Sequence, residues 1–176
     1  MGSFLQNRNS IIRWIIIVIL ILIIIFGFHS YVKSIYQKEL NKYSSQTSQF
    51  ENEMKSSIEN SPKSAYDLTV LGKKMLNNNQ TYWATVVLET AVKKDPQYRD
   101  AALLTGYSYL KSAETINDKQ YAISYSNLAI VYLIKARDLD PVYARTHELL
   151  ALAYKNIGDA ENAALSAQKA KTFNKD

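Results

Sequence analysis

The segment DPVYARTHELLALAYKNIGDAENAA, residues 140–164, begins like an earlier segment, DPQYRDAALLTGYSYL, residues 95–110. Each copy opens with Asp-Pro-x-Tyr and continues into an apolar stretch with the spacing of an amphipathic helix. A motif that returns in this way indicates a repeat, and in a repeat protein the repeat itself is the fold.

The positions of proline and glycine give the length of the repeat. Pro62, Pro96 and Pro141 are the three prolines of the chain, and they lie 34 and 45 residues apart. Gly72 and Gly106 are also 34 residues apart. The chain therefore has a period of 34 residues, with an insertion of 11 residues in its second copy.

Each copy contains the pattern of two helices. In the last copy an apolar face precedes the turn NIGD, in which Gly158 supplies the positive φ angle that ends a helix. Ala163, Ala167 and Ala170 then form a second stripe at spacings of four and three residues. Small side chains in that stripe allow two helices to approach closely.

This pattern resembles the tetratricopeptide repeat family over residues 65–176. The matched positions are Leu71, Gly72, Met75, Ala84, Leu88, Ala91 and Pro96 in copy one, Thr105, Gly106, Tyr109, Ala129, Leu133, Ala136 and Pro141 in copy two, and Leu150, Ala151, Tyr154, Gly158, Ala163, Ala167 and Ala170 in copy three. The family's tryptophan is missing from all three copies, and His147 occupies its position in the third, where we expect it to pack.

The resemblance implies an all-α fold in residues 62–176, an α-solenoid of three antiparallel helix pairs. The repeats are expected at about 65–98, 99–143 with the 11-residue insertion, and 144–176. We expect the insertion to extend the loop or the second helix of copy two, with Asp118 as N-cap of a helix that reaches about Asp138. The polar residues Ser166, Gln168, Lys169 and Lys171 are expected on the outer face of the last helix.

The N-terminal part of the chain has a different character. After a short tail, residues 1–13, the stretch 14–32 contains no charge and includes WIIIVILILIIIFGF, and Arg13 and Lys33 bracket it. About 20 such residues span a bilayer, so we expect an uncleaved, single-pass transmembrane helix in contact with lipid. The charged flanks are nearly balanced. Because a short tail before a first span usually stays inside, we expect a cytoplasmic N-terminus and an extracytoplasmic repeat domain.

Residues 33–61 are expected to form a helical stalk or linker. Tyr36, Leu40, Tyr43, Phe50 and Met54 follow each other at spacings of 4, 3, 7 and 4, which keeps them on one helical face. Such a face pairs two chains or packs on the following domain, or the segment is a simple stalk; a homodimer is not the favoured alternative. We expect Ser61 to cap the next helix, with Pro62 at its first position.

Residue chemistry argues against several classes of function. The chain has no cysteine, and its two histidines, His29 and His147, have no second ligand at metal spacing. No phosphate loop, nucleophile elbow or Ser/His/Asp set is present. Residues 64–176 hold 14 Lys and Arg against 12 Asp and Glu, too even a balance for a nucleic-acid binder. We expect no enzyme activity and no cofactor.

In the tetratricopeptide repeat family the first helices of successive repeats line a concave groove that receives a peptide or a helix. The corresponding positions are Tyr66, Thr69, Lys73, Leu76 and Asn77 in copy one, Asp100, Leu103, Tyr107, Leu110 and Lys111 in copy two, and Arg145, Glu148, Leu152, Lys155 and Asn156 in copy three. The positions of the family's carboxylate clamp hold Thr69, Lys73, Leu104, Arg145 and Leu149, so most of that clamp is missing.

These features together predict a membrane-tethered adaptor that binds a protein partner in its groove, with envelope, secretion or pilus assembly as settings suggested by fold analogy. The alternative is a structural subunit of a larger membrane complex, assembled through the stalk, the last repeat or the arm of repeat two. A linker helix that fills the groove would also be compatible with the sequence.

Overall fold

The computed structural model of the chain describes residues 2–174, apart from the side chains at positions 2–25, 28, 29, 39, 43 and 46. The chain divides into two compact units, Met1–Glu53 and Met54–Asp176. Helix α1 (Gly2–Glu59) runs through the first unit and ends in the second.

A single helix makes up the described part of the first unit, so the helical stalk predicted for residues 33–61 is helical as far as Glu59. Within the part of the chain whose side chains are described, no helix is long and apolar enough to cross a membrane. Most of the predicted anchor, positions 14–25 together with 28 and 29, lies outside that part.

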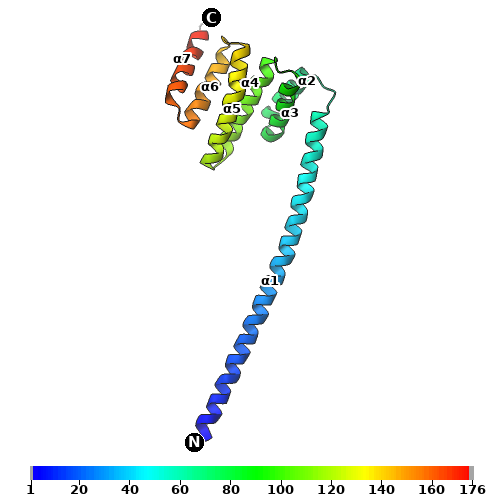
Figure 1. The fold of residues 1–176 in the computed structure, drawn as a ribbon, viewed down its shortest axis with the longest axis vertical. Helices are drawn as coiled ribbons and strands as arrows, with labels where there is room; N and C mark the ends of the chain where they lie inside the picture. The colour runs from blue at the N-terminus through cyan, green and yellow to red at the C-terminus, as the bar shows by residue number, and fades with distance from the viewer. Residues whose placement is uncertain (1, 175–176) are drawn as a thin grey trace. The chain divides into compact units, whose positions relative to one another are not determined.

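The second unit contains six further helices, arranged as three antiparallel pairs (Figure 1). Every helix packs on the next one in the chain, and the first helices of successive pairs also contact each other, α2 with α4 and α4 with α6. This arrangement is the predicted all-α stack of helix pairs. The six helices are α2 (Ala65–Asn77), α3 (Thr81–Lys94), α4 (Arg99–Thr115), α5 (Lys119–Leu139), α6 (Ala144–Ile157) and α7 (Ala160–Phe173).

The start of α2 differs from the prediction. Its N-cap is Ser64 rather than Ser61, and Pro62 lies before the helix. The Ser64 hydroxyl accepts a hydrogen bond from the backbone N–H of Asp67 at 3.1 Å, and the Asp67 carboxylate accepts one from the Ser64 backbone N–H at 3.3 Å. This capping box satisfies two backbone donors at once. Ser61 cannot form one, because a serine stands three residues after it.

The insertion lengthens both helices of the second pair. Helix α4 has 17 residues against 13 and 14 in α2 and α6, and α5 has 21 against 14 in both α3 and α7. The Asp118 side chain accepts hydrogen bonds from the backbone N–H groups of Gln120 and Tyr121, which confirms it as the N-cap of α5. The resulting arm extends beyond the neighbouring pairs at the loop between the two helices.

Glycine brings the two helices of a pair together. A Cβ atom on Gly72 would lie 2.5 Å from Cγ of Leu88, and one on Gly106 would lie 2.6 Å from Cγ of Leu133. The two leucines occupy equivalent repeat positions, and both are fully buried. The regular glycine spacing read from the sequence therefore reflects a close helix–helix approach. Four of the matched alanines, Ala84, Ala91, Ala129 and Ala136, are buried in the second helices of these two pairs, and Ala170 is buried in α7 of the third pair.

The third pair shows two predicted features and one correction. Gly158 adopts a φ angle of +83° at the end of α6, as the turn required. His147 is buried, its Nε2 donates to the carbonyl of Pro141 at 2.7 Å, and its ring lies 5.2 Å from that of Phe173, so it packs as expected. Ser166, expected on the outer face of α7, is buried because this position turns toward α6.

Candidate functional site

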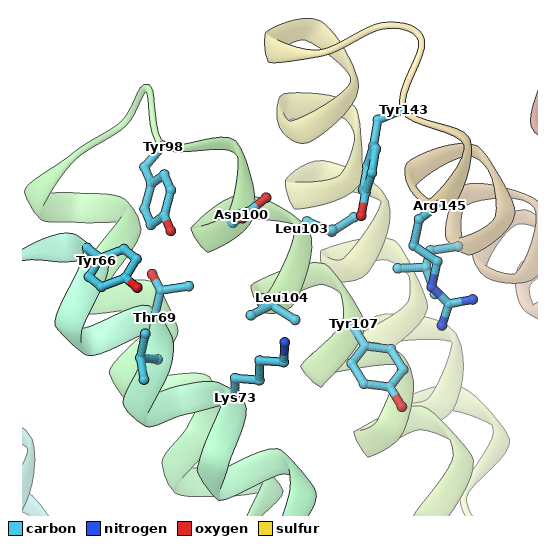
Figure 2. A pocket seen from close by; sticks show the side chains of 12 residues that line it. Tyr66, Thr69, Lys73, Tyr98, Asp100, Leu103, Leu104, Tyr107, Tyr143 and Arg145 are labelled. Carbon is cyan, nitrogen blue, oxygen red and sulfur yellow. The ribbon is translucent and has the colours of Figure 1, made fainter. Parts of the chain in front are cut away.

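The candidate site is a groove of about 450 Å³ formed by the three first helices, α2, α4 and α6, with the short turns that precede α4 and α6 (Figure 2). This volume is in the range of sites that hold a small ligand or a few peptide side chains. The residues that line it are Tyr66, Thr69, Val70, Lys73, Tyr98, Asp100, Leu103, Leu104, Tyr107, Tyr143, Arg145 and Leu149.

Seven of the fifteen residues predicted for the groove belong to this lining: Tyr66, Thr69, Lys73, Asp100, Leu103, Tyr107 and Arg145. Two others do not face it. Leu76 is 2% exposed and packs with Ala84 of α3, and Leu110 is 1% exposed within the main core. Both belong to the apolar faces of their helices, which turn toward the neighbouring helices and away from the groove.

The other six predicted residues lie outside the lining. Five of them stand further along the helices, and Glu148 stands between Arg145 and Leu149 of the lining in the sequence. Asn156 donates a hydrogen bond to Ser126 of α5 at 3.3 Å, so it joins α6 to the preceding repeat. Lys111 lies 3.5 Å from the side-chain oxygen of Asn79. Glu148 pairs with Arg145 at the edge of the groove. The remaining three are Asn77, Leu152 and Lys155, all of which are exposed.

Two tyrosines of the lining, Tyr98 and Tyr143, come from the repeated Asp-Pro-x-Tyr motif and were not among the predicted groove residues. Tyr98 and Tyr143 are the N-cap residues of α4 and α6, and each lies at the edge of the groove (Figure 2). The signal was the motif itself, which places a tyrosine at the same point of two successive repeats. The other additions are Val70, Leu104 and Leu149; the last two were identified only as clamp positions that lack a polar residue.

Arginine and aspartate hold the two motif turns in place. The Arg99 guanidinium donates to the carboxylates of Asp100 and Asp140, the latter at 2.8 Å, and it lies 3.9 Å above the ring of Tyr143. Arg99 therefore joins the start of α4 to the turn before α6. Burial, followed by the nearby Asp100 carboxylate, raises the pKa of Tyr98.

The charges of the groove are unequally compensated. Arg145 binds Glu148 at 2.8 Å, and Asp100 binds Arg99. Lys73 is exposed, points toward the groove (Figure 2), and forms no ion pair with any residue that the structure describes. Among the charged residues of the lining, Lys73 is therefore the one without an ion pair in the described part of the chain, and tyrosine and leucine side chains surround it.

A second cluster of polar groups lies away from the groove, between α3, α4 and α5. The hydroxyls of Tyr109 and Tyr132 both donate to one oxygen of Glu89, at 2.6 and 2.9 Å, and their rings stack 5.7 Å apart. Burial, followed by the Glu89 carboxylate, raises the pKa of Tyr132 to about 12, and the same causes raise the pKa of Tyr109 further. The cluster joins the first two repeats.

Metal chemistry has no candidate in the described part of the chain, where no three His, Asp or Glu side chains are placed to hold an ion. Similarity to known proteins is found at the level of the fold. The sequence matches no family model and no curated protein. Among solved structures, TTC0263, a thermophilic TPR protein of Thermus thermophilus, aligns with a TM-score of 0.59 and 22% identity over 79% of this chain and 70% of its own. The fold is that of a tetratricopeptide-repeat protein.

Two MamA structures give a similar result. A point mutant of MamA aligns with a TM-score of 0.55 and 20% sequence identity, over 68% of this chain and 79% of the MamA chain. A second MamA crystal structure aligns with a TM-score of 0.51 and 22% sequence identity, over 65% of this chain and 60% of the MamA chain. At this identity the likeness concerns the tetratricopeptide-repeat fold alone. The binding properties of the groove formed by α2, α4 and α6 must therefore be argued from the side chains that line it in this chain.

Proposed function

We propose that this protein is a membrane-tethered adaptor whose groove binds a peptide or helix of a partner protein. The observation that carries the proposal is the lining of the groove, in which four tyrosines and three leucines surround Lys73, a lysine without an ion pair among the described residues. Tyrosine supplies a large contact area with little loss of side-chain entropy, and it is common at binding surfaces.

The lining also indicates what the partner presents. The floor of the groove is apolar, formed by Leu103, Leu104 and Leu149, so it suits an apolar side chain of an extended peptide or helix. Lys73 stands beside this floor and favours an acidic group on the same segment. The ligand class is therefore a protein segment with an apolar anchor and a nearby carboxylate.

Membrane tethering is supported by the uninterrupted apolar stretch 14–32 between Arg13 and Lys33. The helix that contains it continues to Glu59, which would hold the repeat domain some distance from the bilayer. A tether raises the local concentration of the domain at the membrane, so modest affinity for a membrane-associated partner suffices. The repeat domain is proposed to lie outside the cytoplasm, in a setting such as envelope, secretion or pilus assembly.

The proposal is tested by capture of partners with the full chain as bait. The groove variant combines Tyr66→Ser with Lys73→Glu, because both side chains are exposed and their loss leaves the core intact. The control variant combines Tyr121→Ser with Lys169→Glu, outside the groove. Tyr121 is an apt match, since Tyr66 and Tyr121 are both 62% exposed.

We expect one or more proteins to be captured by the wild type and the control and to be lost from the groove variant. The bound segment of such a protein, made as a peptide, should then bind the wild-type chain at least tenfold more tightly than the groove variant. Equal capture by all three baits would refute a binding role for the groove.

A second candidate function is a structural subunit that assembles through the arm of repeat two. Tyr121, Leu128 and Val131 follow one exposed face of α5 at spacings of seven and three residues. An exposed apolar stripe of this kind is a common feature of contact surfaces. Under this alternative the control variant, which removes Tyr121, would lose partners that the groove variant retains.

A further inference from the structure

The seam of α1 is an exposed apolar face with heptad spacing. We define this seam by Tyr36, Leu40, Phe50 and Met54, all of which are exposed, Leu40 by 50% and Phe50 by 59%. In a heptad, Tyr36 and Phe50 take d positions, and Leu40 and Met54 take a positions. The d and a positions between Leu40 and Phe50 are occupied in the sequence by Tyr43 and Thr47. Six successive layers of one helical face are thus defined over about 18 residues.

The helix that carries the seam has little intrinsic stability. Its middle reads SSQTS, residues 44–48, and serine and threonine are mediocre helix formers. In the first unit, taken by itself, no other helix packs on this segment. Helices in proteins gain most of their stability from packing of an apolar face, so a partner along the seam would stabilise this helix.

We propose that the partner is a second copy of this chain, bound in a parallel two-stranded coiled coil along the seam. Residues beside the seam favour this orientation. In a parallel pair the flanking g positions face e positions five residues further along the other chain. Glu51 then faces position 46, a glutamine. The position that Glu53 would face, Ile58, lies beyond the seam and packs on the core of the repeats, so no two like charges meet along the seam.

An antiparallel pair that aligns the same layers is less favourable. Leu40 of one chain would then meet Phe50 of the other, and Glu53 would face position 39 of the other chain, which is also a glutamate. This arrangement brings two glutamates together at each end of the seam, and like charges at such positions destabilise a coiled coil. The charge pattern therefore selects the parallel pair.

The parallel dimer would have two consequences that rest on the proposed function. Both chains would enter the membrane from the same side, so anchoring at 14–32 would assist pairing through the effective concentration. Aromatic residues in three of the six layers make a weaker pair than leucine, and anchoring would offset this weakness. The assembly would also present two grooves, so a partner with two binding segments would be held by both.

Disulfide formation in single-cysteine variants tests the dimer, because the chain contains no cysteine of its own. The seam variants are Leu40→Cys and Phe50→Cys, and the matched controls are Ser45→Cys and Asn52→Cys, which occupy f positions on the opposite side of the same helix. Each full-length variant is expressed in cells and oxidised with copper phenanthroline before lysis. The disulfide-linked dimer is then quantified on a non-reducing gel.

We expect each seam variant alone to form several-fold more linked dimer than either control. Because this readout involves no groove residue, it remains valid even if the groove binds nothing. Linked dimer that forms only when Leu40→Cys and Phe50→Cys chains are expressed together would overturn the parallel arrangement. Equal yields at all four positions, or no linked dimer at any of them, would overturn pairing along the seam.

Discussion

Because α4 and α5 approach closely at Gly106, we expect a glycine-to-alanine substitution there to destabilise the protein, although such a substitution inside a helix usually stabilises it. Replacing glycine by alanine inside a helix normally stabilises a protein, by about 1 kcal/mol. At Gly106, however, the added Cβ would lie 2.6 and 2.8 Å from two carbons of Leu133 and 3.2 Å from the Ala129 carbonyl oxygen. Leu133 is fully buried, so its side chain cannot relieve the contact by turning toward solvent.

The magnitude follows from two opposing terms. Overpacking of a filled core costs about 1–3 kcal/mol, which exceeds the gain of about 1 kcal/mol in helix propensity. Gly106→Ala should therefore lower the free energy of unfolding by about 1 kcal/mol. In a Leu133→Ala background the obstructing carbons are gone, and the same substitution should raise the free energy of unfolding by about 1 kcal/mol. The coupling between the two positions is then about 2 kcal/mol.

The assay is urea unfolding of the four chains of this double-mutant cycle, followed by circular dichroism at 222 nm. A shift of the midpoint without a change of slope would show that stability alone has changed. The reasoning fails if Gly106→Ala stabilises the chain in the presence of Leu133, or if its effect is the same in both backgrounds. Either result would mean that α4 and α5 do not meet closely at this glycine.

The remaining predictions concern the tyrosine cluster and the cap of α6. Between about pH 10 and 12 the unfolded chain releases tyrosine protons that Tyr109 and Tyr132 keep in the folded state, so the free energy of unfolding should fall as pH rises. Tyr132→Phe should make this fall less steep in urea titrations at a series of alkaline pH values. Glu89→Ala removes the acceptor of both hydroxyls and should cost about 2 kcal/mol in urea unfolding at neutral pH, whereas no loss would show that water replaces the carboxylate. Gly158→Ala should cost about 1 kcal/mol in the same assay, because φ is +83° there, and Gly158→Asn should cost less; equal effects of the two would contradict a left-handed cap.

Helix ends could be predicted from the sequence, because they depend on contacts between residues that are close in the chain. Gly158 ends α6 and Asp118 begins α5 through contacts within a few residues. At the start of α2, a single side chain decides which of two serines caps the helix. Ser61 and Ser64 are the same residue type, and only the aspartate three positions after Ser64 completes the hydrogen-bonded box that fixes the start of the helix.

The groove depends on how three helices are rotated against one another, and this could be predicted only in part. Tyr66 and Tyr107 lie in the lining, whereas Leu76 and Leu110, taken from the same family positions, are covered by neighbouring helices. Tyr98 was missed because it stands before its helix, and a pattern of helical faces does not include a residue in a turn.

The sequence by itself determined the repeat, its period and the pairing of helices, because glycine, alanine and proline at fixed intervals allow close approach at some positions and end helices at others. The tertiary structure alone decided which side chains share the groove and how the insertion is divided between α4 and α5. Both outcomes depend on the packing of side chains that are far apart in the chain, and the intervals within one repeat carry no information about that packing.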